Sequence, residues 1–98
     1  MITKKQAIKI ANYIFREGTE NTTQGNWCFY WEELEKTFDI KMDTETAEFI
    51  TETLCSMYPL AILDVWGEDE TGEKVLDVNF GLWYYENDEI DDNGEIIK

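Results

Sequence analysis

Carboxylates are the most abundant reactive groups of this chain. Its 98 residues include 22 Asp and Glu, eight Lys and Arg and no His, for a formal net charge of −14. Acid–base catalysis needs a proton carrier tuned near neutral pH, and without His that role would fall to a buried carboxylate, lysine or cysteine. So many carboxylates make close pairs inevitable, and no pair stands out. We therefore expect a solvated acidic surface and no enzymatic activity.

The two cysteines are the other candidates for reactive groups. Cys28 and Cys55 are the only thiols, and the chain has no His to activate either one. Both are therefore predicted to be core or near-core residues rather than nucleophiles. The same lack of ligands argues against a zinc site. No catalytic residue, metal or cofactor is predicted.

The net charge limits the classes of partner. No apolar run reaches the ~18 residues that span a bilayer, and anionic lipid and phosphate backbones repel an acidic protein. Direct membrane or nucleic-acid binding is therefore disfavoured. The charge is also uneven: residues 64–98 carry twelve acidic and two basic side chains, whereas residues 1–63 carry ten and six. Carboxylates on a rigid surface can imitate the phosphate spacing of a duplex and occupy a groove lined by Lys and Arg.

Capping signals predict a helix at the start of the chain. Thr3 and Gln6 have the spacing of a capping box, and Gly18 is a C-terminal stop signal. Residues 18–26 are bracketed by glycines and rich in polar turn formers, which predicts a loop. Half of the basic residues of the chain lie in the first helix: Lys4, Lys5, Lys9 and Arg16.

A short strand and two further helices are predicted next. Residues 27–31 are aromatic, which favours a strand, and apolar spacing predicts a helix over 31–38. A third helix is predicted from an N-cap at Asp43 or Thr44 to a stop at Pro59. Its core stripe is expected to be Ala47, Ile50, Leu54 and Met57. Its opposite face is acidic, with Glu45, Glu48 and Glu52.

The C-terminal third predicts a hairpin and a tail. Residues 60–66 and 74–85 favour strands, and 67–72 carry glycine at both ends, as a hairpin loop should. The buried face of the second strand is expected to carry Leu76, Val78, Phe80, Leu82 and Tyr84. Residues 86–98 are acidic with little to bury. We therefore expect one globular domain over 1–85 and an acidic tail over 86–98.

This order of elements resembles that of winged-helix domains. The similarity covers residues 27–80, and 31–38 is similar to the second helix of that family. It implies an α+β fold of three helices followed by a β-hairpin, with the acidic C-terminal tail. Residues 43–57 would stand in place of the DNA-recognition helix, and the wing tip would carry Glu68, Asp69 and Glu70. A winged-helix domain that binds DNA needs Arg and Lys at these positions, so we expect this surface to bind a protein instead.

In size, acidity and aromatic content the chain resembles phage and mobile-element anti-CRISPR proteins that mimic DNA. The resemblance implies a cytoplasmic inhibitor, in a bacterium or phage-infected host cell, that occupies the basic DNA or RNA groove of a CRISPR effector or nuclease. Trp66 and the aromatic residues at 83–85 are expected to serve as apolar anchors. The predicted protein-binding residues are Glu45, Glu48, Glu52, Trp66, Glu68, Asp69, Glu70 and Glu73.

Three alternatives stay open from the sequence. An immunity protein or antitoxin against a basic nuclease toxin would need the same acidic surface. A winged-helix adaptor or transcription regulator is the second, and the basic first helix keeps weak DNA contact conceivable. In the plainest case, the aromatic residues pack the core and the acidity serves solubility. The charge does not decide between a monomer and a homodimer.

Overall fold

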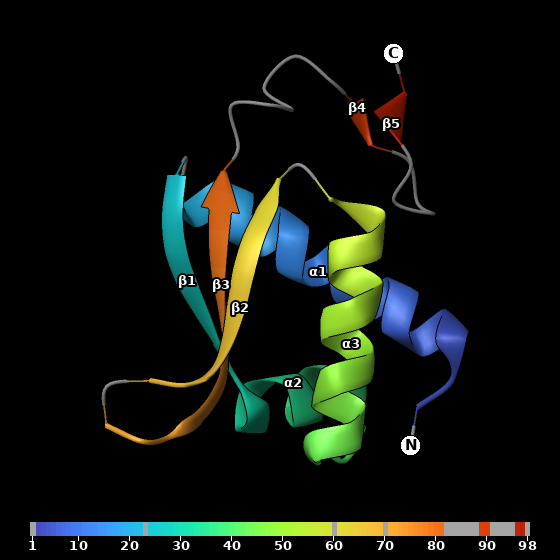
Figure 1. Ribbon diagram of the computed structural model, residues 1–98. Helices are drawn as coiled ribbons and strands as arrows, with labels where there is room; N and C mark the ends of the chain where they lie inside the picture. Colours follow the sequence, from blue (N-terminus) through green and yellow to red (C-terminus); the bar gives the residue numbers. More distant parts are fainter. Residues whose placement is uncertain are drawn as a thin grey trace.

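The computed structural model of the chain describes residues 2–22, 24–59, 61–69, 71–81, 89–90 and 96–97. Its elements are α1 (Lys4–Asn21), β1 (Gln24–Tyr30), α2 (Trp31–Phe38), α3 (Thr44–Met57), β2 (Ile62–Glu68), β3 (Lys74–Gly81), β4 (Glu89–Ile90) and β5 (Ile96–Ile97) (Figure 1). Three strands form one antiparallel sheet in the order β1–β3–β2, and β4 pairs antiparallel with β5 in a separate sheet.

The fold class is α+β, but the predicted arrangement of three helices followed by a hairpin, winged-helix-like, is wrong in its order. The chain runs helix, strand, helix, helix, strand, strand, because residues 24–30 form a full strand between the first two helices. All seven residues of β1 pair with β3, from Gln24 opposite Gly81 to Tyr30 opposite Val75. This ladder pairs residues 24–26, which were expected in a loop, with residues 79–81 of β3. The hairpin is therefore part of a three-stranded sheet whose central strand is β3.

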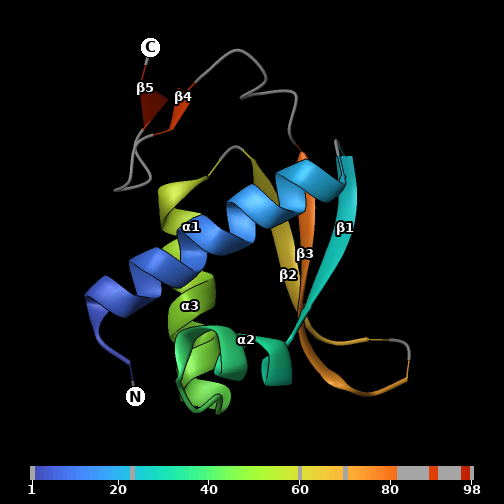
Figure 2. The same ribbon diagram turned by 180° about the vertical axis from the view of Figure 1, so that it is seen from behind.

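The helices cover one face of this sheet. Figures 1 and 2 show α1 crossing that face and α3 standing alongside β2. On β3, Leu76, Val78 and Phe80 alternate along the strand and are all buried, which confirms the predicted inward face as far as the strand is described. Leu82 and Tyr84, predicted to continue it, lie outside the described residues.

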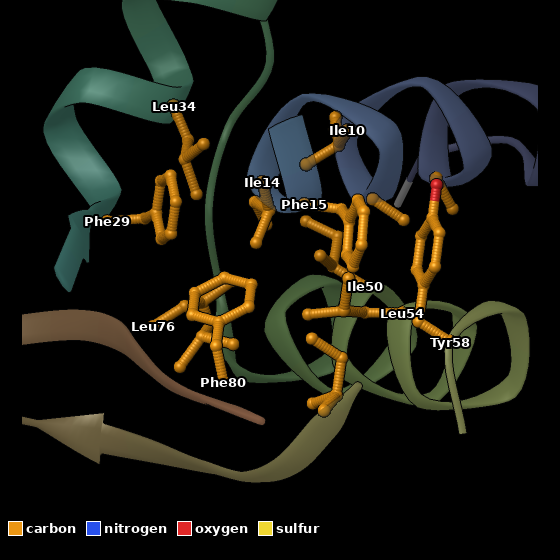
Figure 3. Close-up of a cluster of buried hydrophobic side chains, with 14 of the residues drawn as sticks. Ile10, Ile14, Phe15, Phe29, Leu34, Ile50, Leu54, Tyr58, Leu76 and Phe80 are labelled. Atoms are coloured by element: carbon orange, nitrogen blue, oxygen red, sulfur yellow. The ribbon is translucent and has the colours of Figure 1, made fainter. Parts of the chain in front are cut away.

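Aromatic stacking joins α1 to the end of α3. The rings of Phe15 and Tyr58 are parallel, with centroids 4.0 Å apart, and Figure 3 shows them side by side in the core. The Tyr58 hydroxyl donates to Asn12 Oδ1 at 2.5 Å, which satisfies both groups where they are buried. Ile50 and Leu54, on the predicted core stripe of α3, are completely buried, whereas Ala47 and Met57 are partly buried.

Gly18 was expected to end the first helix, and this prediction is wrong. α1 continues through it to Asn21, with Thr22 as the C-cap. Gly18 is buried in the helix interior, where an added Cβ would lie 2.1 Å from Cζ of Phe80. Glycine is required at this position because any side chain would overlap the Phe80 ring, and not because the backbone is left-handed. It lets α1 approach the central strand closely.

Local capping sets the other helix ends. The Thr3–Gln6 capping box is confirmed, and Asp43 is the N-cap of α3, accepting from the Thr46 amide at 2.7 Å. Between α2 and α3, the Glu35 carboxylate accepts from the Met42 amide at 2.9 Å. The bonds of Glu35 and Asp43 hold the short turn between α2 and α3.

Replacing Gly18 with alanine tests the close approach of α1 to β3. Alanine is favoured over glycine inside a helix by about 1 kcal/mol. Here the new methyl would overlap the Phe80 ring, and overpacking of a core costs about 1–3 kcal/mol. We expect Gly18→Ala to lower the free energy of unfolding, measured by urea denaturation. Gly67→Ala is the control, because its Cβ would meet nothing within 4 Å. A more stable Gly18→Ala protein would contradict this packing.

Candidate protein-binding site

A groove of about 620 Å³ lies between α3 and the stem of the hairpin. One wall is the N-terminal part of α3 and the other is the end of β2, with residues of α2 and β3 between them. In Figure 1 the hairpin swings away from α3 at this level. The groove is lined by Trp31, Thr44, Ala47, Glu48, Thr51, Glu52, Val65, Trp66, Gly67, Glu68, Lys74 and Leu76.

Two local features accompany the separation of the walls. The groove face of α3 carries residues 44, 47, 48, 51 and 52, the spacing of one helix face, and three of the five are the small residues Thr44, Ala47 and Thr51. On the opposite wall, the register of β2 with β3 shifts between Trp66 and Glu68. Two residues of β2 here face three of β3, and an extra residue of this kind bends the strand pair and increases its twist, in line with the hairpin turning away from the helix.

Tryptophan side chains contribute apolar surface to the groove. Trp66 is 63% exposed, the largest exposed fraction among the large hydrophobic residues that the structure describes. Trp31, at the start of α2, packs partly against the core and also lines the groove. Its indole Nε1 is buried without a hydrogen-bond partner among the described residues. Tryptophan is enriched among the residues that anchor protein interfaces.

Ion pairing divides the carboxylates of the groove into two kinds. Glu68 is paired with Lys74, with 2.8 Å between Oε1 and Nζ. The side chains of Glu48 and Glu52 have no hydrogen bond or ion pair within the described ranges, and both are exposed. The uncompensated negative charge of the groove therefore lies on α3, and the hairpin wall is locally neutralised.

A second groove, of about 680 Å³, lies between the hairpin tip and the other sheet face. It shares Trp66 and Glu68 with the first groove and is also lined by Asn26, Cys28, Asp69, Thr71 and Asp77. Asp69 organises the tip, because its Oδ1 accepts from the Thr71 hydroxyl at 2.6 Å and from the Thr71 and Glu73 amides. The Thr71 side chain is the main cause that lowers the pKa of Asp69, so this carboxylate stays charged at neutral pH.

Two groups beside Asp69, Cys28 and Tyr30, and the separate thiol of Cys55 on α3 are held in their protonated forms. Burial, and then the nearby Asp77 carboxylate, raise the pKa of the Cys28 thiol. The charge of Asp69 raises the pKa of Tyr30, whose hydroxyl lies 3.5 Å from Asp69 Oδ2. Burial also raises the pKa of Cys55. At neutral pH these groups are a neutral thiol, a neutral phenol and a second neutral thiol, none of which is an activated nucleophile.

The structure brings together half of the eight predicted contact residues. Glu48, Glu52, Trp66 and Glu68 line the first groove. Asp69 lies in the second groove, on the far side of Trp66. Glu45 and Glu73 are exposed but line neither groove. Glu70 and the aromatic residues at 83–85 lie outside the described residues.

The apolar lining of the groove was not predicted from the sequence. Ala47 and Leu76 were assigned to core faces, and Trp31 and Val65 were given no role beyond their helix and strand. A signal for part of it was present: Thr44, Ala47 and Thr51 alternate with glutamates on one helical face, so that face is too small and too polar for a core. The contribution of Trp31 had no such signal, because it depends on how α2 meets β3.

Comparisons with known proteins assign no function to this site. The chain matches no family model, no curated protein and no solved structure. Within the described part of the chain, no group of three or more Cys, Asp or Glu side chains is placed to hold a metal ion. None of the helices in those ranges has the length and apolar content to cross a bilayer.

Thr71→Val tests the role of Asp69 at the hairpin tip. Valine keeps the shape and the backbone amide but removes the hydroxyl donor, so the pKa of Asp69 should rise toward the usual value of an aspartate. A pKa lowered by folding stabilises the protein above the pKa of the unfolded chain, and this stabilisation is lost as pH falls through the folded pKa. Acid unfolding of the tip should therefore begin at higher pH. Carboxyl ¹³C NMR titration measures the shift, with Thr51→Val as the control; an unchanged Asp69 pKa would contradict the assignment.

Proposed function

We propose that this chain is a non-enzymatic, acidic protein-binding domain that inhibits a basic nucleic-acid-binding protein by occupying its DNA or RNA groove. The supporting observation is the groove itself, whose lining combines the unpaired carboxylates of Glu48 and Glu52 with the exposed Trp66. Unpaired surface carboxylates are available to a partner without the loss of an existing ion pair. The indole offers the apolar contact that gives such an interface its affinity.

Charge over the whole molecule supports the same type of partner. A net charge of −14 on 98 residues attracts a basic surface over distances set by the salt concentration and opposes binding to nucleic acid itself. Lys36 and Lys74, two of the eight basic residues, are held in ion pairs with Glu32 and Glu68. The partner class we propose is a bacterial defence protein, such as a CRISPR effector, as for anti-CRISPR proteins that mimic DNA.

A DNA-cleavage assay with purified effectors tests this function. We expect the chain to slow cleavage by at least one CRISPR effector, and the effect to weaken with added salt or excess DNA, because both compete for the basic groove. The double variant Glu48→Gln/Glu52→Gln should weaken inhibition by about tenfold or more, since loss of close interfacial charge pairs costs at least about 1.5 kcal/mol.

A second double variant, with the same net charge as Glu48→Gln/Glu52→Gln, distinguishes an effect of the groove from an effect of total charge. Glu20→Gln/Asp39→Asn also removes two exposed carboxylates but leaves the groove intact, so it should inhibit like the wild type. Equal loss in both double variants would show that only total charge matters. A purified basic nuclease toxin serves as the parallel arm, and inhibition of that enzyme alone would favour an immunity protein. Inhibition of neither enzyme class would overturn the proposal.

A further inference from the structure

We infer that the groove between α3 and the hairpin binds an arginine side chain of the partner. The aliphatic stem would lie on the apolar lining, and the guanidinium would lie between the carboxylates of α3 and the ring of Trp66. This inference rests on the proposed function, because it names the group of the partner that this same site recognises. Three properties of the groove carry it: its lining, its free carboxylates and the position of Lys74.

The lining suits a long side chain with an apolar stem. Leu76 is buried, Val65 and Ala47 are partly buried, and Trp31 is packed against the core, yet all four line the groove. A fully hydrated ion gains nothing from such a surface. Arginine and lysine can cover it with their methylene chains while the charged end stays at the rim. A phosphate or another anion would be repelled by the adjacent carboxylates.

The charged rim favours the planar guanidinium. Glu48 and Glu52 are four residues apart on α3, about 6 Å along the helix axis, and both line the groove. A guanidinium carries five N–H donors in a fixed fork and can serve carboxylates on more than one side. It also stacks on an aromatic face, which Trp66 offers with 63% of its surface exposed. An ammonium is a compact point charge that lacks the fork and is more strongly hydrated.

Lys74 directs the incoming cation to α3. Its Nζ already lies 2.8 Å from Glu68 Oε1 on the opposite wall, so the carboxylate of Glu68 is compensated within the protein. A second cation near Glu68 would be repelled by Lys74. The partner's arginine is therefore steered toward Glu48 and Glu52, whose charges have no counterion in the described part of the chain.

Peptide titration tests the inference with the full chain. A nine-residue alanine-based peptide with three arginines is added while the indole N–H signals of the protein are followed by NMR. Matched peptides replace every arginine with lysine or with citrulline, which has the shape of arginine without its charge. We expect the Trp66 signal to shift with the arginine peptide, about fivefold weaker binding of the lysine peptide and no binding of the citrulline peptide.

Substitutions locate the peptide and control for folding. Trp66→Ala should lower the affinity for the arginine peptide about fivefold, because the stacking surface is lost. The ring is exposed, so its removal leaves the core intact. Trp27→Ala is the matched control: Trp27 is 38% exposed on β1 and lines neither groove, so the affinity should not change. Glu48→Gln/Glu52→Gln alters only exposed side chains and should also lower the affinity for the arginine peptide.

The outcomes separate this inference from the proposed function. Equal affinity for arginine and lysine peptides, or binding that is insensitive to Trp66→Ala, would overturn arginine recognition while leaving inhibition of an effector to stand on its own assay. Arginine-specific binding at Trp66 together with no inhibition of any effector or nuclease would support the site and reject the proposed function. A shift of the Trp27 signal in place of Trp66 would place the peptide outside the groove and overturn the inference.

Discussion

The close approach of α1 to β3 is the packing constraint on which the rest of the domain depends. Gly18 has no side chain where the Phe80 ring lies, so the helix can cover the inward face of the central strand directly. The same helix carries Phe15, which stacks on Tyr58 and fixes the end of α3. Because α1 sets the position of both the sheet and α3, it also sets the distance between the two walls of the groove.

The groove is a place where close packing stops for identifiable reasons. The register of β2 with β3 shifts after Trp66, where the hairpin turns away from α3, and the small residues of the facing helical surface leave the space unfilled. A large aliphatic side chain at position 47 or 51 would convert this surface into more core. Instead it holds an apolar lining with two free carboxylates at its rim, which is an arrangement suited to a basic, partly apolar side chain.

Local pairing, more than total charge, distinguishes the acidic residues from one another. Asp69 is held by the hydroxyl and amide of Thr71 and the amide of Glu73, and Glu68 by Lys74, whereas Glu48 and Glu52 have no such partners in the described ranges. Carboxylates of the first kind organise the hairpin, and those of the second kind are available to a ligand. A count of acidic residues treats all of them alike, although Lys74 compensates the charge of Glu68 and neutral donors already occupy one oxygen of Asp69.

The sequence by itself determined the features that depend on neighbours along the chain. The Thr3–Gln6 capping box, the Asp43 N-cap, the acidic outer face of α3 and the alternation of β3 all follow from local hydrogen bonding or from periods of 3.6 and 2 residues. Tertiary structure alone decided what residues far apart in sequence do together. Gly18 became a packing position because Phe80 lies against it, residues 24–26 became strand because β3 pairs with them, and Trp31 reached the groove because α2 abuts the hairpin stem. Such contacts leave no periodic trace in the sequence, since each depends on a partner more than 30 residues away.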